Sequence, residues 1–318
     1  MKKYLTAIAM LLLICVPTTV GAAQDWPKST ITIVVPFNAG GGTDMTGRLL
    51  AKFLSEELKV NVVVKNVAGA TGTIGAAEVA RAKPDGYTLG YYSPGPAVGM
   101  PNLRDLPYGK DSWECVALVT DERVYIAYPK SSPWNSFQEM VDDVKANPDK
   151  YVYSSAGVGG AIYISMKAAL QAIGLQVRHI PERGSPEAYK ALAGGTSQLY
   201  SAQSPELKRF EVKTHAIVGN GRSKKNPDIP TLKELGYDVP HVTNWCGLFA
   251  PKGTPKELVV KLSDAVGRVF QNKEFLDTVE RMDVDAHYLP YTEFAKYYNE
   301  QFDLYEKLLL EEKSSKDK

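Results

Sequence analysis

Cysteine and histidine are scarce in this sequence, with three cysteines and four histidines among 318 residues. Cys15 lies in the apolar run at the N-terminus, so the rest of the chain holds only Cys115 and Cys246. Nothing in their spacing is typical of a metal site, and we expect neither a metal nor a cofactor. In an oxidising compartment the two cysteines could pair. Each lies in a run typical of a buried strand, however, which favours two inert core thiols.

An excess charge of either sign is also missing. The chain carries 37 basic and 36 acidic residues, a formal net charge of +1. Without Lys2 and Lys3, which precede the N-terminal apolar run, the balance is 35 to 36 and the net charge is about −1. Such a surface creates no strong field for phosphate groups. Nucleic acid and acidic lipid are therefore not expected as partners.

Only one long apolar run occurs, Leu5–Val16. Its basic start, and the small residues that lead to Ala23, are typical of a secretory signal peptide. The run is too short for a stable transmembrane helix, which needs about 20 apolar residues. We therefore predict a signal peptide over residues 1–23. The secreted chain would begin at Gln24 and is long enough for two domains.

Motifs for catalysis and nucleotide binding are missing as well. The sequence contains no G-x-x-x-x-G-K-[ST] loop, no G-x-G-x-x-G turn, no H-E-x-x-H helix and no serine within G-x-S-x-G. Carboxylates stand in pairs such as Glu56-Glu57 and Asp142-Asp143, but these occupy the polar faces of helical patterns. The chain is therefore predicted to hold a ligand without transforming it, and not to be an enzyme.

What is present is an alternation of short apolar runs with amphipathic helical patterns. This order, with short connections, is typical of an α/β protein whose sheets are mostly parallel and flanked by helices. The predicted strands are Ile31–Val35, Val62–Val64, Leu89–Tyr92, Val116–Val119, Val124–Tyr128, Tyr151–Ser154, Val177–Ile180, Leu199–Ser201, Ala216–Val218 and Gly247–Ala250. The predicted helices are Met45–Leu58, Ile74–Ala82, Phe137–Ala146, Ile162–Ile173, Pro186–Ala193, Lys256–Phe270 and Thr292–Leu310.

One segment, Val116–Pro129, places two predicted strands almost end to end. A strand that leaves one domain immediately before another enters the next would have this pattern. We expect a return crossing near Val242–Cys246. The predicted domains are then residues 24–123 plus 246–318 for lobe 1 and residues 124–245 for lobe 2.

Two glycine-rich loops each join a predicted strand to a predicted helix. In the first, Gly40–Gly42 allow close backbone approach, and Thr43 and Asp44 are favourable residues for a helix start. The second, within Tyr151–Leu170, repeats this order. Free amides and the positive end of the helix dipole make such loops anion sites. Glycine is also common in strand–helix turns that bind nothing, but two such loops on different lobes would face each other across a cleft.

Five stretches of the chain form one recognisable pattern when they are taken together and in order. They are "VPFNAGGGTD", "NVAGATGTIGAAEVARAKPDGYTLGYYSPG", "LPYGKDSWECVALV", "YSSAGVGG" and "FAPKGTPKELVVKLSDAV". Together they resemble the periplasmic substrate-binding components of tripartite tricarboxylate transporters, also called Bug-type receptors. The resemblance extends through nearly the whole chain after residue 23.

The resemblance implies a two-lobed periplasmic-binding-protein fold, similar to type II, with a cleft that closes on a small carboxylate. Backbone amides, hydroxyls and ordered waters from the two loops would hold the carboxylate, with few formal charges. Asp44 is expected to fix its own loop by accepting backbone N–H bonds, because a carboxylate beside the ligand's carboxylate would repel it. Trp245 would cover the apolar body of the ligand or be simple core. Arg183 would reach a distal carboxylate or lie in solvent.

Matching by position gives a set of expected ligand-binding residues from both lobes. Lobe 1 would supply the first glycine loop and the end of the third strand, and lobe 2 the second loop and the start of a later helix. The set is Phe37, Ala39, Gly40, Gly41, Thr43, Asp44, Ser93, Ser155, Gly157, Gly159, Arg183, Gly184, Ser185 and Trp245.

The chain also departs from the family pattern. Gly160 and Tyr163 stand where many members have a hydroxyl residue and a histidine. Ser197-Gln198 and Ala202 stand where many have acidic residues. A lost carboxylate near the pocket argues against a ligand amino group that needs a counter-charge. The predicted ligand is therefore a purely anionic or apolar-bodied carboxylate, such as a di- or tricarboxylate or an aromatic acid, and not an amino acid.

The expected function is that of a monomeric periplasmic receptor that delivers its ligand to a membrane permease of large and small subunits. Two alternatives remain open from the sequence. The protein could instead act as the ligand-sensing partner of a membrane signalling protein, or as a small-acid enzyme on the same fold. The missing acid–base pair disfavours the enzyme.

Overall fold

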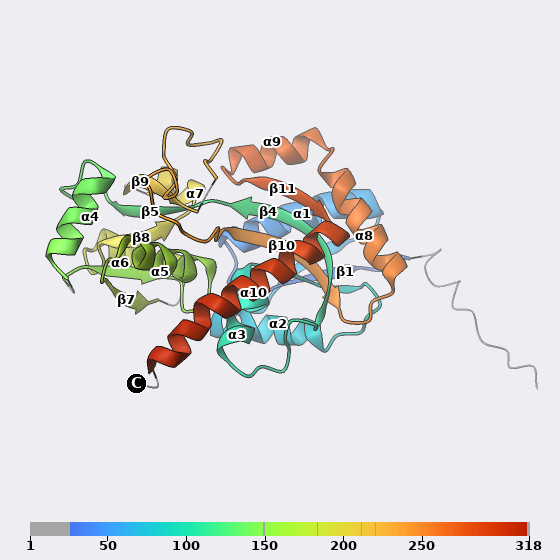
Figure 1. Cartoon of the computed structure of the whole chain (residues 1–318). Coiled ribbons are helices and arrows are strands. Elements are labelled where there is room, and N and C mark those ends of the chain that lie inside the picture. The colour runs from blue at the N-terminus through green and yellow to red at the C-terminus, as the bar shows by residue number, and fades with distance from the viewer. Residues whose placement is uncertain (1–25, 149, 183, 211, 220, 317–318) are drawn as a thin grey trace, which may run out of the picture.

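The computed structural model describes residues 26–148, 150–182, 184–210, 212–219 and 221–316. The predicted signal peptide and Arg183 lie outside these residues. Two β-sheets, each with its own helices, lie side by side (Figure 1). We call the half around the first sheet lobe 1 and the half around the second lobe 2. No helix among the described residues combines the length and the apolar character needed to cross a bilayer.

Lobe 1 contains a six-stranded sheet whose two faces are covered by different helices. On one face, α1 (Gly42–Leu58), α8 (Lys256–Val269) and α9 (Lys273–Arg281) bury apolar side chains. On the other lie α2 (Thr73–Ala80) and α10 (Tyr291–Lys316). In spatial order the strands are β11 (Ala286–Pro290), β4 (Trp113–Glu122), β10 (Asn244–Pro251), β3 (Thr88–Tyr92), β1 (Ile31–Val35) and β2 (Val62–Asn66).

Lobe 2 contains a five-stranded sheet. In spatial order its strands are β7 (Arg178–Pro181), β6 (Val152–Ser155), β8 (Leu199–Ala202), β5 (Val124–Pro129) and β9 (Val212–Val218). Helix α5 (Ala161–Ile173) follows β6, and the short α7 (Ser204–Arg209) follows β8. One cluster of buried side chains joins helix α6 (Ser185–Ala193) to β5 and β8, while α4 (Phe137–Ala146) contributes to the larger core.

Most strands of each sheet point the same way, although both sheets contain antiparallel pairs. In lobe 1, β1, β2, β3 and β4 share a direction, and β10 and β11 oppose it. In lobe 2 only β5 opposes the other strands. Strand β5 has this direction because it follows β4 after a single residue, Arg123, and enters the second sheet without a reversal.

The two crossings between the lobes lie next to each other. Strand β10, on the return path, pairs with the end of β4, with Asn244 opposite Glu122 and Trp245 opposite Asp121. The first crossing at Arg123 is therefore flanked by a second, hydrogen-bonded strand. Two adjacent strands of this kind are a natural axis for a hinge motion.

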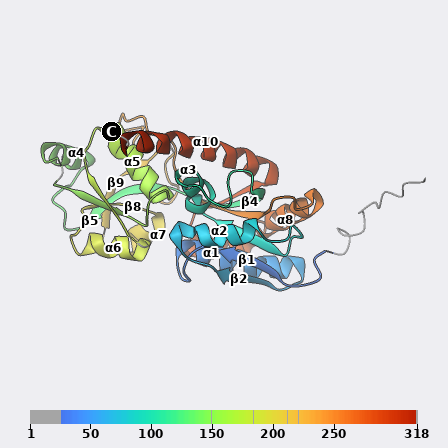
Figure 2. The same cartoon turned by 90° about the horizontal axis from the view of Figure 1, so that it is seen from below.

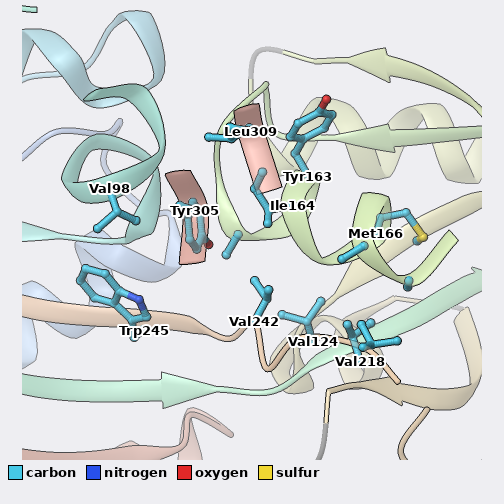
Figure 3. Close-up of a cluster of buried hydrophobic side chains, with 14 of the residues drawn as sticks. Val98, Val124, Tyr163, Ile164, Met166, Val218, Val242, Trp245, Tyr305 and Leu309 are labelled. Carbon is cyan, nitrogen blue, oxygen red and sulfur yellow. The ribbon is translucent and has the colours of Figure 1, made fainter. Parts of the chain in front are cut away.

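Helix α10 extends along both lobes (Figure 2). Its first half packs on lobe 1, where Phe294 is fully buried. Near its C-terminal end, Tyr305 and Leu309 lie beside Tyr163 and Ile164 of α5 in one apolar cluster (Figure 3). The core is therefore continuous between the lobes on this side of the molecule.

The two cysteines of the described chain are free thiols. Cys115 lies on β4 opposite Phe249, whereas Cys246 lies on β10 opposite Thr120. Burial raises the pKa of the Cys246 thiol to about 12, and burial likewise raises the pKa of Cys115. Both thiols are therefore protonated at neutral pH and poorly nucleophilic. This agrees with the interpretation of two inert core thiols.

Candidate ligand-binding cleft between the lobes

The loop between β1 and α1 presents a helix start without a side-chain cap. Residues 38–42 are exposed, and Gly40 has a left-handed φ of 86°. Gly41 is the N-cap of α1, in an extended conformation with φ −79° and ψ 167°, and has no side chain to bond the first amides. An uncapped helix start of this kind favours an anion through its amides and its dipole.

The buried side chain of Asp44 stabilises this loop through hydrogen bonds. Its side chain is only 2% exposed. Its Oδ2 accepts hydrogen bonds from the Gly40 amide at 2.8 Å and from Arg48 Nε at 3.0 Å, and its Oδ1 accepts one from Asn66 Nδ2 at 2.7 Å. Burial raises the pKa of Asp44, but these hydrogen bonds outweigh burial, and the pKa lies below its ordinary value. As expected from the sequence, the carboxylate accepts a backbone N–H of its own loop.

Replacing Asp44 by alanine is expected to lower the free energy of unfolding by about 2–3 kcal/mol, because three donors lose a charged acceptor. The contribution of a carboxylate with a lowered pKa is present above the unfolded pKa of about 4 and is lost as the pH falls through the folded pKa. The difference between wild type and Asp44→Ala should therefore shrink below about pH 4. Urea unfolding at several pH values measures it. Glu56→Ala on the exposed face of α1 is the control, and equal losses for both variants would contradict the role of Asp44.

The loop between β6 and α5 repeats the design of the first loop in lobe 2. Gly160 is the N-cap of α5 with φ −79° and ψ 166°, nearly the angles of Gly41, and again no side-chain cap is present. Gly157 and Gly159 have left-handed φ angles of 108° and 86°, which favour glycine. The two loops therefore present similar uncapped helix starts.

The buried hydroxyl of Ser155 stabilises the second loop through hydrogen bonds. Its side chain is fully buried, and its hydroxyl lies 2.8 Å from His179 Nε2 and donates to the Gly157 carbonyl at 3.1 Å. His179 also stacks on Tyr153, with ring centroids 4.5 Å apart. The sequence prediction did not include His179, because it lies on β7, 24 residues away. The hydroxyl of Ser155 thus orders the loop in this arrangement.

The glycine loop of lobe 2, between β6 and α5, meets lobe 1 at η1 (Ala70–Gly72) and η2 (Gly95–Gly99). Gly99 and Gly159 approach so closely that a Cβ on Gly99 would lie 1.8 Å from the Gly159 carbonyl oxygen. Thr71 lies in this junction, since a Cβ on Gly95 would be 3.5 Å from its methyl group and one on Gly157 would be 3.4 Å from its hydroxyl. The lobes are therefore in direct backbone contact, and we call this arrangement closed.

Thr71 is a candidate site residue that the sequence analysis missed. Its φ of 55° is unusual for a β-branched residue, and backbone strain of this kind often accompanies binding sites. It lies in the stretch "NVAGATGTIG", whose three glycines were a usable signal of close backbone approach.

The first loop borders the same segments of lobe 1. A Cβ on Gly72 would lie 3.3 Å from Pro36, which begins the first loop, and 3.1 Å from Pro96 of η2. Ser93, which is 8% exposed, directly follows the last residue of β3 and lies two residues before η2. The two glycine loops and Ser93 thus lie around η1 and η2 at the junction of the lobes.

The other predicted residues occupy varied positions. Phe37 is half-buried against the lobe 1 core, and its carbonyl accepts a hydrogen bond from Asn66 at 3.0 Å, whereas Ala39 is exposed. The Thr43 hydroxyl accepts a long contact of 3.8 Å from Cys246 Sγ. Gly184 and Ser185 begin α6 and are partly exposed.

Trp245 is fully buried. Its ring packs against Phe249, Phe294 and Tyr297 at centroid distances of 5.9–6.3 Å. Its indole N–H has no hydrogen-bond partner among the described residues. In this arrangement the ring is part of the core and offers no exposed surface to a ligand.

Within the residues that the structure describes, no group of three histidine, cysteine or acidic side chains is arranged to hold a metal ion. The polar groups around the junction are mainly backbone amides and hydroxyls. Asp44 is compensated by Arg48. The site can therefore bind an anion by hydrogen bonding, with little formal positive charge.

Comparison with known proteins agrees with this arrangement. Residues 46–313 match the family described as "Tripartite tricarboxylate transporter family receptor". The chain is 32% identical over 285 residues to "UPF0065 protein in gbd 5'region" of Cupriavidus necator, covering 86% of this chain and 85% of that protein.

Two solved structures from Rhodopseudomonas palustris share the fold. MatC with bound malate has a TM-score of 0.79 and 29% identity, covering 89% of this chain and 100% of MatC. Rpa4515 with adipate has a TM-score of 0.83 and 25% identity, covering 90% and 97%. With a family match over most of its length, this two-lobed chain belongs to the receptor family of the tripartite tricarboxylate transporters.

Proposed function

We propose that this protein is a periplasmic receptor that captures a small organic carboxylate between its lobes and delivers it to a tripartite tricarboxylate-type permease. One observation carries the proposal. Two uncapped glycine helix starts, Gly41 of α1 and Gly160 of α5, belong to loops that border the same junction from opposite lobes. Amides at two helix starts replace the hydration of a carboxylate without a buried cation.

We further propose that the lobes comprise residues 24–123 plus 246–318 and residues 124–245, with the hinge at Arg123 and β10. The protein would act as a monomer that is exported by its N-terminal signal peptide. The ligand would touch the residues expected from the sequence around the two loops, with Thr71 added. Phe37 and Ser93 complete the lobe 1 side.

We infer the ligand class from two positions in lobe 2 that hold no acidic residue. Gln198, at the position where the family resemblance places the first acidic residue, is half-buried. Its side-chain oxygen accepts from the Val152 amide at 3.1 Å, and its side-chain amide donates to the Gly195 carbonyl at 2.7 Å. Ala202, at the second such position, is fully buried. With no carboxylate at these positions, the proposed ligand carries carboxylates and no amino group, as do the malate and adipate bound by relatives.

A thermal-shift panel of organic acids on protein that starts at Gln24 tests this function. A ligand at 100 times its Kd stabilises the folded state by about 2.7 kcal/mol. For a chain of this size, that should raise Tm by about 5–10 °C. We expect such shifts with dicarboxylates such as malate or adipate and none with alanine or glycine. If aspartate or glutamate were the tightest ligand, the proposed ligand class would be wrong, and if no acid in the panel shifted Tm, the receptor function would fail.

A further inference from the structure

A buried carboxylate lies at the junction of the lobes on the side of the hinge. Glu122 is the last residue of β4 and is 6% exposed. Its Oε2 has no hydrogen-bond partner among the described residues. A carboxylate without a full set of partners is costly to bury while it is charged. A negative charge on Glu122 therefore destabilises the closed arrangement of the lobes.

Groups from both lobes face Glu122. Asp285, from the segment between α9 and β11 of lobe 1, and Glu206, on α7 of lobe 2, both act on it as like charges. Lys225, from the segment after β9, is the opposing cation, and the side chain of Gln203 offers a hydrogen bond. Most of this surrounding is assembled only when the lobes meet.

Ion pairs join the lobes beside this carboxylate. Lys208 of α7 lies 2.7 Å from Asp283 Oδ1, and Lys225 lies 3.6 Å from the same oxygen and 3.4 Å from Glu280. Because Lys225 is shared with these acidic residues, it cannot compensate Glu122 fully. Lys225 and Asp285 also line a surface hollow between the lobes, which gives protons a path to the group.

These surroundings raise the pKa of Glu122. Burial raises the pKa of Glu122 to about 8, with further contributions from Asp285 and Glu206, while Gln203 and Lys225 oppose the rise. Burial also raises the pKa of Glu206 to about 7, although the Gln203 amide at 3.0 Å and the Tyr200 hydroxyl at 3.1 Å oppose it. When the lobes separate, water reaches Glu122, and its pKa should return toward the ordinary value of about 4.3. The partners of Glu206 all belong to lobe 2, so its environment depends less on closure.

We propose that closure of the lobes around the ligand is coupled to proton uptake by Glu122. The inference rests on the proposed receptor function and adds a proton to the binding reaction. Between the open and closed pKa values, the open form is deprotonated and the closed form is protonated. Ligand affinity therefore falls as the pH rises, by up to tenfold per pH unit for one proton, and this dependence disappears above the closed pKa.

Other titratable groups near the hinge lie on a different side of β4. Asp121 faces His287, whose Nδ1 lies 3.5 Å from Asp121 Oδ2, and Arg123. His241 lies near the same pair, and burial lowers its pKa. Asp285, by contrast, faces Glu122, and burial raises its pKa, opposed by Lys225 and Arg123. A variant of Glu122 is therefore needed to distinguish its proton uptake from that of these other groups.

Isothermal titration calorimetry with malate or adipate, whichever raises Tm, tests the proposal. Titrations near pH 7 in MOPS and in imidazole, which differ in ionisation enthalpy, count the protons taken up, and titrations between pH 6 and 9 give the pH dependence of Kd. We expect about one proton per ligand near pH 7 and a Kd that rises about tenfold between pH 6 and 7 and levels off near pH 9. Zero proton uptake by the wild type overturns the proposal without any variant.

Glu122→Gln keeps the shape of the side chain and mimics the protonated form. It should lose most of the proton uptake, flatten the pH dependence and bind more tightly than the wild type at pH 9. A merely structural role would not produce tighter binding at high pH. Asp264→Asn, which neutralises an exposed carboxylate on α8 that takes no part in this cluster, should keep the wild-type profile. Equal proton uptake by the wild type and by Glu122→Gln would overturn this inference alone. Failure of every acid to bind would instead overturn the proposed receptor function.

Discussion

Replacing Gly99 by alanine is expected to weaken ligand binding by about 10- to 100-fold, because overpacking a tight contact costs about 1–3 kcal/mol. A Cβ at this position would lie 1.8 Å from the Gly159 carbonyl oxygen, and backbone cannot yield as a side chain does. The lobes would then be unable to close fully. Calorimetry with the ligand from the panel measures the affinity, and small-angle scattering measures whether the ligand still makes the protein more compact.

Gly109→Ala is the control for this prediction. Gly109 lies in the segment before β4, outside the two glycine loops, a Cβ on it would meet no atom within 4 Å, and its φ is not in the left-handed region. We expect its affinity to stay within about twofold of the wild type, a change of less than about 0.5 kcal/mol. If Gly99→Ala bound as tightly as the wild type and still compacted, the contact between Gly99 and Gly159 would not be part of the ligand-bound form.

Replacing Trp245 by alanine is expected to lower the free energy of unfolding by about 3–5 kcal/mol, the usual cost of removing a large aromatic side chain from a core. The ring is fully buried among Phe249, Phe294 and Tyr297, so its loss leaves a cavity between β10 and α10. Urea unfolding measures the loss. A decrease of less than about 1 kcal/mol would contradict the core role.

Trp245→Phe is the companion variant, because it keeps an aromatic ring and removes the indole N–H that has no partner among the described residues. We expect most of the stability to be retained. The same variant tests the prediction that Trp245 covers the ligand. A stable Trp245→Phe protein with much weaker binding would support ligand contact, whereas unchanged affinity would assign the ring to the core alone.

Local pattern was sufficient for the elements that bury one clear apolar face. Strand β1 and helix α4 have the predicted bounds, Ile31–Val35 and Phe137–Ala146. Helix α4 begins where Ser136 caps it by accepting from the Glu139 amide at 3.1 Å, which is a signal within four residues. Elements at the edges were harder. The prediction missed β11 (Ala286–Pro290), because it is a partly exposed edge strand without an apolar run. The first half of β9 was missed for the same reason.

Residues close together in the chain were enough to specify most of the strands and helices, the two consecutive strands on either side of Arg123, the two glycine loops and the role of Asp44 in fixing the first loop. Each of these features arises within a short segment, so its pattern is visible there. The packing of distant segments was needed to turn the Ser155 hydroxyl to His179, to enclose Trp245 among core aromatics and to bring acids from both lobes to Glu122. The neighbours that set these environments are distant in the chain. They come together within lobe 2 for Ser155 and within lobe 1 for Trp245, and only Glu122 has neighbours from both lobes.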